Sequence, residues 1–222
     1  DGRSLRRVSR DGVVGRHAGV LEDYALVAHG FLALLQATGD VTWAQHARTL
    51  LNEALAMFAA DDGGFHDTAE NAETLVARPR DPSDNASPSG QSALVHALLT
   101  FAALTGSGRH RDAAEAALRN VRTLAERAPR FAGWSLAAAE AALAGPVEVA
   151  VVGEPRDPVR AALETVARRV TSPGAVVVVG EPDRSPGGGS GDDRDVLPLL
   201  AGRDLVGGSA AAYVCRGLVC ER

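Results

Sequence analysis

Two adjacent carboxylates and a tyrosine, Glu22, Asp23 and Tyr24, open the first strongly periodic segment of the chain. Adjacent positions on a regular helix diverge by about 100°, so the two carboxylates cannot both face one point. One can line a binding site while the other complements the positive end of the helix. We therefore take Glu22 and Asp23 as candidate catalytic acid/base groups and Tyr24 as a candidate ligand-binding ring. The alternatives are the usual preference of first turns for acids and core packing for Tyr24.

A second polar group lies in the proline-punctuated stretch 78–92, R-P-R-D-P-S-D-N-A-S-P-S-G-Q-S. Asp84 is the third candidate catalytic carboxylate, and Arg78, Ser89 and Gln91 are candidate ligand-binding residues. Ser89 and Gln91 fall in the first turn of an expected helix, where free backbone N–H groups can hold an anionic or hydroxyl-rich ligand. Arg78 can pair with a ligand carboxylate or with Asp84 itself, as a purely structural clasp. Alternatively, the whole stretch is a solvated linker before a helix capped by Ser87.

The remaining reactive side chains favour structural roles. The six histidines are spread along the chain without a metal-binding spacing, and His29 and His96 occupy matching points on two expected helices. Cys215 and Cys220 lack the spacing of redox or zinc pairs, so structural thiols are the preferred interpretation. A disulfide with each other, or with another domain, is the alternative. We predict no metal and no cofactor.

Composition excludes several classes of function. The chain has 222 residues, 45% of them hydrophobic and 23% charged, with a net charge of −5. This charge argues against nucleic-acid binding, which needs a basic surface. Because no apolar run approaches the ~20 residues that span a bilayer, we expect a cytoplasmic protein without membrane contact. The chain begins Asp1-Gly2-Arg3 without a methionine, and we expect it to be a fragment of a longer protein.

Helical periodicity dominates the first two thirds of the chain after an Arg-rich segment, residues 1–18, that is expected to be extended or to form a short hairpin. Apolar residues recur at helical spacing in five segments: 20–37, 41–59, 89–105, 110–127 and 133–143. Short breaks at Gly39 and Gly106 alternate with long loops, which predicts antiparallel helical hairpins. Such hairpins, recurring about every 70 residues, suit an α/α toroid whose long loops gather at one end. We thus predict a partial α/α toroid over residues 1–145.

The pattern changes at Pro146. Two β-branched runs, 147–152 and 175–179, flank a helical segment whose N-cap candidate is Asp157. This order predicts a βαβ unit with parallel strands. Residues 146–222 are therefore expected to form a small C-terminal α/β segment. It contains a Gly-rich linker near 186–193, a short apolar run at 196–200 and a further strand at 210–215. No G-x-G-x-x-G pattern follows a strand, so dinucleotide binding is not expected.

Four stretches together resemble one family. They are G-V-L-E-D-Y-A at 19–25, G-G-F-H-D-T at 63–68, the stretch from R-P-R-D to P-S-G-Q-S within 78–92, and A-Y-V-C at 212–215 leading to Cys220. In this order they resemble the C-terminal part of thioredoxin-domain-containing proteins of the YyaL and spermatogenesis-associated protein 20 type. Two departures are Gln91, where the family tends to have asparagine, and the lack of a proline shortly after the last cysteine.

The resemblance covers nearly all of the chain and implies both a fold and a partner. Family members carry an N-terminal thioredoxin-like domain and an (α/α)6 barrel similar to those of six-hairpin glycosidases and N-acylglucosamine epimerases. The resemblance thus implies that this chain holds the last helical hairpins and binds, or acts on, a small sugar-like ligand. The alternative is a non-catalytic scaffold for a thioredoxin-like domain. A cleft flanked by the candidate residues favours the first hypothesis, and their scattering over separate surfaces favours the second.

Overall fold

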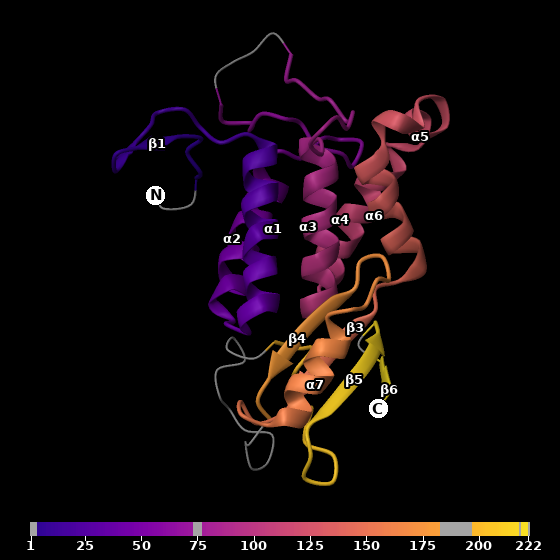
Figure 1. The fold of residues 1–222 in the computed structure, drawn as a ribbon. Coiled ribbons are helices and arrows are strands. Elements are labelled where there is room, and N and C mark those ends of the chain that lie inside the picture. Colours follow the sequence, from indigo (N-terminus) through magenta and orange to yellow (C-terminus); the bar gives the residue numbers. More distant parts are fainter. Residues whose placement is uncertain (1–3, 73–76, 183–196, 218, 222) are drawn as a thin grey trace.

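Two helical hairpins form the larger part of the computed structural model, which describes residues 4–72, 77–182, 197–217 and 219–221 (Figure 1). The first hairpin consists of α1 (Leu21–Thr38) and α2 (Thr42–Met57), and the second of α3 (Gly90–Thr105) and α4 (Gly108–Arg119). Gly39 and Gly106 end α1 and α3 in the left-handed conformation that glycine adopts readily. The predictions of a mainly α chain and of short turns within the hairpins are confirmed.

Helix α3 lies at the centre of the helical part. It packs between α1 on one side and α4 and α6 (Gly133–Ala144) on the other, so nearly all of its side chains are buried. The apolar face predicted for the first helix is also found in the core. Its buried members are Leu21, Tyr24, Ala25, Ala28, Leu32 and Leu35.

The single helix predicted over 110–127 is wrong. Helix α4 ends at Arg119, and a separate short helix, α5 (Arg122–Arg127), is followed by the 3-10 turn η1 (Pro129–Phe131). Two features of the tertiary packing explain the break. The Asn120 side chain donates to the Asp62 carbonyl oxygen at 3.0 Å, and Val121 is buried at the turn. The second helix also ends two residues earlier than predicted, at Met57 instead of Ala59.

The C-terminal residues build a mixed four-stranded sheet of order β4-β3-β5-β6. Strand β3 (Glu148–Val152), helix α7 (Pro158–Ala167) and strand β4 (Val176–Gly180) form the predicted βαβ unit with parallel strands. Strand β5 (Ala211–Arg216) runs antiparallel to β3 and confirms the strand expected at 210–215, and β6 (Val219–Glu221) pairs with β5. The linker predicted near 186–193 lies outside the described residues.

One hydrophobic core connects the sheet with the helices. Side chains of one sheet face, such as Ala150, Val178 and Tyr213, belong to the same buried cluster as the residues of α1 and α3. The opposite face carries valines that pack against Leu163 and Ala167 of α7. At the end of α1, the Gln36 side-chain oxygen accepts a hydrogen bond from the Val177 N–H at 3.0 Å. The core therefore crosses the position where we divided the chain, and the domain boundary at 145/146 stays a prediction.

Cys215 is buried and disulfide-bonded. The register of β5 and β6 places Cys220, the only other cysteine of the chain, opposite Cys215. The preferred interpretation of Cys215 as a structural thiol is therefore wrong. Two positions directly opposite in an antiparallel pair have Cα atoms about 4.5–5.5 Å apart, which is within the range that a disulfide bridges. Strand register can therefore bring two cysteines together whatever their spacing in the sequence.

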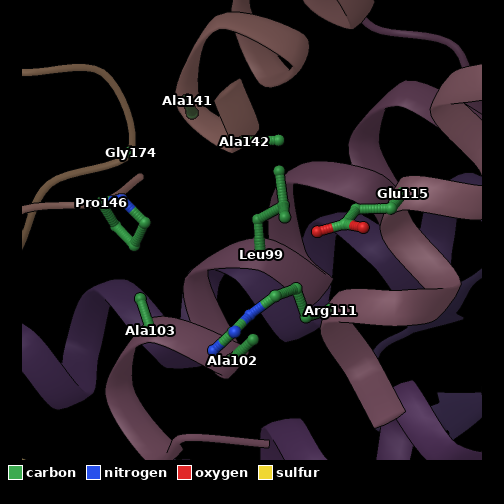
Figure 2. A pocket seen from close by; sticks show the side chains of 9 residues that line it. All are labelled: Leu99, Ala102, Ala103, Arg111, Glu115, Ala141, Ala142, Pro146 and Gly174. Carbon is green, nitrogen blue, oxygen red and sulfur yellow. The ribbon is translucent and has the colours of Figure 1, made fainter. Parts of the chain in front are cut away.

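A small cavity of about 40 Å³ lies where α3, α4 and α6 meet Pro146 and Gly174 (Figure 2). Four of its nine lining residues are alanines, so the elements approach one another closely. The volume accommodates no more than about two or three water molecules. We therefore treat this cavity as a packing seam between helices and sheet and not as a ligand site.

Gly174 controls this seam, and its replacement by alanine should destabilise the protein by about 2–3 kcal/mol. Gly174 has φ +68°, and an added Cβ would lie 2.8 Å from the Ala141 Cβ. The matched control is Gly202→Ala, because Gly202 occupies the same position of a turn with φ +64° and has no atom within 4 Å of an added Cβ. Urea unfolding should show a loss of about 1 kcal/mol for the control, from the backbone alone. Equal losses in the two variants would contradict a role of the Ala141 contact.

Among the described residues, no helix combines the length and the apolar character that a membrane crossing requires.

Candidate functional site

The long connections gather at the end of the molecule where α1, α3 and α6 begin (Figure 1). The Leu21 N–H donates to the Asp67 carbonyl oxygen at 3.0 Å, and the Asp67 N–H donates to the Pro79 carbonyl oxygen at 2.9 Å. A Cβ added to Gly90 would lie 3.2 Å from the Glu22 nitrogen, so the first turns of α1 and α3 are in contact. The segments 19–24 and 78–92 therefore lie at the same end of the hairpins.

A hollow of about 550 Å³ opens at this end, between the N-terminal segment and the chain that follows α2. We call it the loop-end hollow. The short hairpin of β1 (Ser9–Arg10) and β2 (Val13–Val14) belongs to the N-terminal segment, as expected for residues 1–18. The lining residues come from both segments: Arg7, Arg16, His17, Ala18, Gly19, Val20, Thr68, Ala69 and Ala72.

Glu22 and Asp23 hold one of these lining residues in place. The Arg7 guanidinium donates to Glu22 Oε1 at 2.7 Å and lies 3.0 Å from Asp23 Oδ2. Asp23 also accepts a hydrogen bond from the Val20 N–H at 2.8 Å, which satisfies a free donor at the start of α1. The two carboxylates therefore stand behind the wall of the hollow, next to Arg7, and both have a partner.

Tyr24 anchors the N-terminal segment from the interior. Its ring is buried 5.2 Å from the Phe58 ring, and its hydroxyl oxygen accepts a hydrogen bond from the Leu5 N–H at 3.0 Å. Burial raises the pKa of the Tyr24 phenol, against the hydrogen bond from Leu5. A Cβ added to Gly19 would lie 3.1 Å from the Tyr24 ring, so the ring lies directly behind the floor of the hollow.

Arg78 acts as a clasp on backbone oxygens. Its Nη2 donates to the Thr68 carbonyl oxygen at 2.6 Å and to the Met57 carbonyl oxygen at 3.0 Å. The side chain thereby fixes Thr68, a lining residue, to the end of α2. In the described part of the chain Arg78 forms no ion pair with Asp84. The structural role considered from the sequence is therefore found, but with backbone oxygens as partners instead of the Asp84 carboxylate.

Asp84 is buried in a network of four hydrogen bonds. Its Oδ1 accepts from the Ser89 N–H at 3.0 Å and the Ser92 hydroxyl at 2.6 Å. Its Oδ2 accepts from the N–H groups of Trp134 and Ser135 at 2.9 and 3.1 Å. Because these donors lie at the first turns of α3 and α6, one carboxylate caps two helices, where negative charge is favourable.

Ser89 and Gln91 complete the start of α3. Ser89, and not Ser87 as expected, is the N-cap, and its hydroxyl oxygen accepts from the Ser92 N–H at 3.1 Å. The Gln91 side-chain oxygen accepts from the Phe65 N–H at 3.2 Å. Gln91 is only 3% exposed, and its side-chain nitrogen has no partner among the described residues.

The structure thus divides the residues selected from the sequence into two groups. Glu22, Asp23, Tyr24 and Arg78 support the walls of the loop-end hollow through the contacts given above. Asp84, Ser89 and Gln91 lie in the buried capping network of α3 and do not line the hollow. The sequence reasoning missed Arg7, Arg16, His17 and Thr68 as lining residues. Only Thr68 carried a signal, since it ends the G-G-F-H-D-T stretch.

Asp67, in the same stretch, has the carboxyl group of the site with the clearest electrostatic perturbation. Partial burial raises the pKa of Asp67, and the nearby carboxylates of Asp81 and Glu22 raise it further, against a hydrogen bond from the Asp81 N–H at 3.0 Å. A carboxyl group with a raised pKa is suited to donate a proton. Sequence reasoning did not select this residue for chemistry.

Comparison with known proteins gives one consistent result. The chain is similar to human spermatogenesis-associated protein 20, with 28% identity over 205 residues. The matched region covers 91% of this chain and 25% of the human protein. The rat protein of the same name gives the same values, and the mouse protein is 28% identical over 211 residues. The chain spans about a quarter of the length of these curated relatives. No family model matches it.

This similarity agrees with the resemblance found in the sequence motifs, since the relatives bear the name of the same family. Three of the four stretches that carried the resemblance also lie together in space. The stretches at 19–25, 63–68 and 78–92 contact one another through the hydrogen bonds of Asp67.

Proposed function

We propose that the chain is the C-terminal, six-hairpin-like portion of a thioredoxin-domain-containing protein, and that its loop-end hollow binds or acts on a small sugar-like ligand. The similarity to spermatogenesis-associated protein 20 supports the first part. The arrangement of the helices supports an arc of an α/α toroid, because α1, α3 and α6 begin at one end and α2 and α4 run back towards it.

The observation that carries the ligand site is the loop-end hollow itself. Its volume of about 550 Å³ lies within the range of small-molecule sites. The exposed side chains of Arg16 and His17 supply polar groups there, which a hydroxyl-bearing ligand such as a sugar can contact.

The candidate catalytic carboxylates have different roles in this proposal. Glu22 and Asp23 adjoin the hollow through Arg7, and burial raises the pKa of Asp67 in the direction that favours proton donation. We assign Asp84 to positioning, because both of its oxygens are engaged at helix starts. A glycosidase-like pair of Glu22 and Asp84 would need a separation of about 5–10 Å and an open approach to both.

A monosaccharide panel tests the site. Glucose, mannose and N-acetylglucosamine are titrated into the ¹⁵N-labelled chain, and we expect amide shifts at Gly19, Val20 and Thr68. Ala18→Trp places a large side chain at the hollow and should weaken binding about tenfold or more, because Ala18 is an exposed lining residue. Ala56→Trp is the matched control, because Ala56 is exposed on α2 and does not line the hollow. Shifts elsewhere, or none at all, would refute the site.

A second candidate function, a non-catalytic scaffold for the thioredoxin-like domain, is favoured by a specific observation. Arg78, Asp84 and Gln91 direct their hydrogen bonds to this chain's own backbone instead of an open surface. In that case the thioredoxin-like domain should slow amide hydrogen exchange at the loop end of the longer protein. Unchanged exchange on removal of that domain would contradict a scaffold at this surface.

A further inference from the structure

Basic side chains line the loop-end hollow, and the carboxylates of Glu22 and Asp23 pair with Arg7 behind its wall. The chain has a net charge of −5, yet the described residues that line the hollow include Arg7, Arg16 and His17 and no carboxylate. A concave site lined by one sign of charge attracts ligands of the opposite sign. The lining therefore favours a negatively charged ligand.

The basic residues are not equally available. Arg7 is paired with Glu22 and Asp23, which leaves it as a fixed part of the wall. Arg16 is exposed and, in the described part of the chain, its side chain takes part in no ion pair and no hydrogen bond. Its backbone is nevertheless fixed, because the Arg6 guanidinium donates to the Arg16 carbonyl oxygen at 2.8 Å. Arg16 is thus the cation that a ligand can engage without breaking an existing pair.

The opposite wall carries Thr68, which Arg78 holds through its carbonyl oxygen at 2.6 Å. A bare phosphate ion would fill only a small part of about 550 Å³. A ligand that reaches both walls is therefore larger than phosphate and has its anionic group at the Arg16 end.

We propose that the loop-end hollow binds an anionic, hydroxylated small molecule, either a sugar phosphate or a sugar acid. Arg16 and His17 contact its anionic group, and the rest of the molecule extends through the hollow towards Thr68. This inference rests on the proposed function and narrows the class of its ligand from sugar-like compounds to charged ones.

Isothermal titration calorimetry of the chain with four probes tests the inference: glucose, glucose 6-phosphate, glucuronate and inorganic phosphate. We expect at least one of the two charged sugars to bind at least tenfold more tightly than glucose and than inorganic phosphate. That preference should shrink several-fold between 20 mM and 200 mM salt, because exposed charges are screened. Binding of the phosphate ester or of the acid alone identifies the anionic group.

Two arginine variants make the test specific. Arg16→Gln should abolish the preference for the charged sugar without changing the thermal unfolding curve. Arg10→Gln is the matched control, since Arg10 lies in the same N-terminal segment, is 94% exposed at its side chain and, among the described residues, pairs with Asp11 alone. It should retain the full preference.

The outcomes separate this inference from the proposed function. If glucose binds as tightly as the charged sugars, or if Arg16→Gln retains the preference, the inference is overturned and the proposed function stands. Equal binding of inorganic phosphate and glucose 6-phosphate, or equal losses in the two arginine variants, also overturns it. If none of the sugars binds, both fail.

Discussion

Replacing Asp84 with alanine should lower the free energy of unfolding by about 4 kcal/mol, at about 1 kcal/mol for each donor left without a partner. Four donors lose their acceptor: the N–H groups of Ser89, Trp134 and Ser135 and the Ser92 hydroxyl. They are buried or half-buried at the first turns of α3 and α6, where solvent does not freely replace the carboxylate. A loss of this size is exceptional for one substitution, because it affects two helices at once.

Urea unfolding followed by circular dichroism measures this loss. Asp81→Ala is the matched control, because Asp81 is exposed on the same loop and its carboxylate accepts only from the Ser83 N–H. It should change stability by no more than about 0.5 kcal/mol. The stability loss of Asp84→Asn should lie between those of Asp84→Ala and Asp81→Ala. The amide keeps one acceptor oxygen, but its N–H₂ group faces N–H or O–H donors whose hydrogen bonds the second carboxylate oxygen had accepted. If Asp84→Ala is as stable as Asp81→Ala, Asp84 does not cap these helices.

The protein should also lose stability between pH 7 and pH 5 through His110. This residue is 5% exposed, and its Nδ1 lies 2.7 Å from the Ser107 hydroxyl oxygen at the start of α4. Burial lowers the pKa of His110 to about 4, helped by the positive charges of Arg109 and Arg48. In the unfolded chain the imidazole takes up its proton near pH 6.5, so between pH 6.5 and pH 4 the unfolded state binds more protons. Stability therefore falls as the pH falls through this range.

His110→Gln removes the titration and leaves an amide that can still contact Ser107. The difference in unfolding free energy between wild type and variant should shrink by about 2 kcal/mol from pH 7 to pH 5. The pKa shifts of Asp67 and of other acidic groups are present in both proteins, so their effects on stability cancel in this difference. A difference that stays constant from pH 7 to pH 5 would show that His110 does not titrate in this way.

The hairpins could be predicted from sequence because local signals agree with the final packing. The apolar spacing of α1 and α3 and the glycines that end them are all read within one segment of the chain. The break after Arg119 could not be read in this way. It depends on a hydrogen bond from Asn120 to Asp62, which lies 58 residues earlier, and nothing in the local pattern interrupts the helix.

The candidate site was predictable in its location and less so in its contacts. The proline-rich stretch 78–92 and the acids at 22–23 do lie at one end of the hairpins. The role of Asp84 depends on N–H groups 50 and 51 residues later in the chain, which no spacing rule links to it. Arg7 and Arg16 line the hollow only because the N-terminal segment folds against Thr68, and an Arg-rich opening carries no motif that would indicate this.

The shared carboxylate cap has a consequence for how the sequences of relatives can differ in length. Asp84 is tied to Ser89 on one side and to Trp134 on the other, so the four residues from 85 to 88 act as a spacer of fixed length. One residue inserted or deleted there would pull the carboxylate away from one helix start or the other. Changes of length should instead accumulate at turns such as Asp11–Gly12, which are exposed and cap nothing.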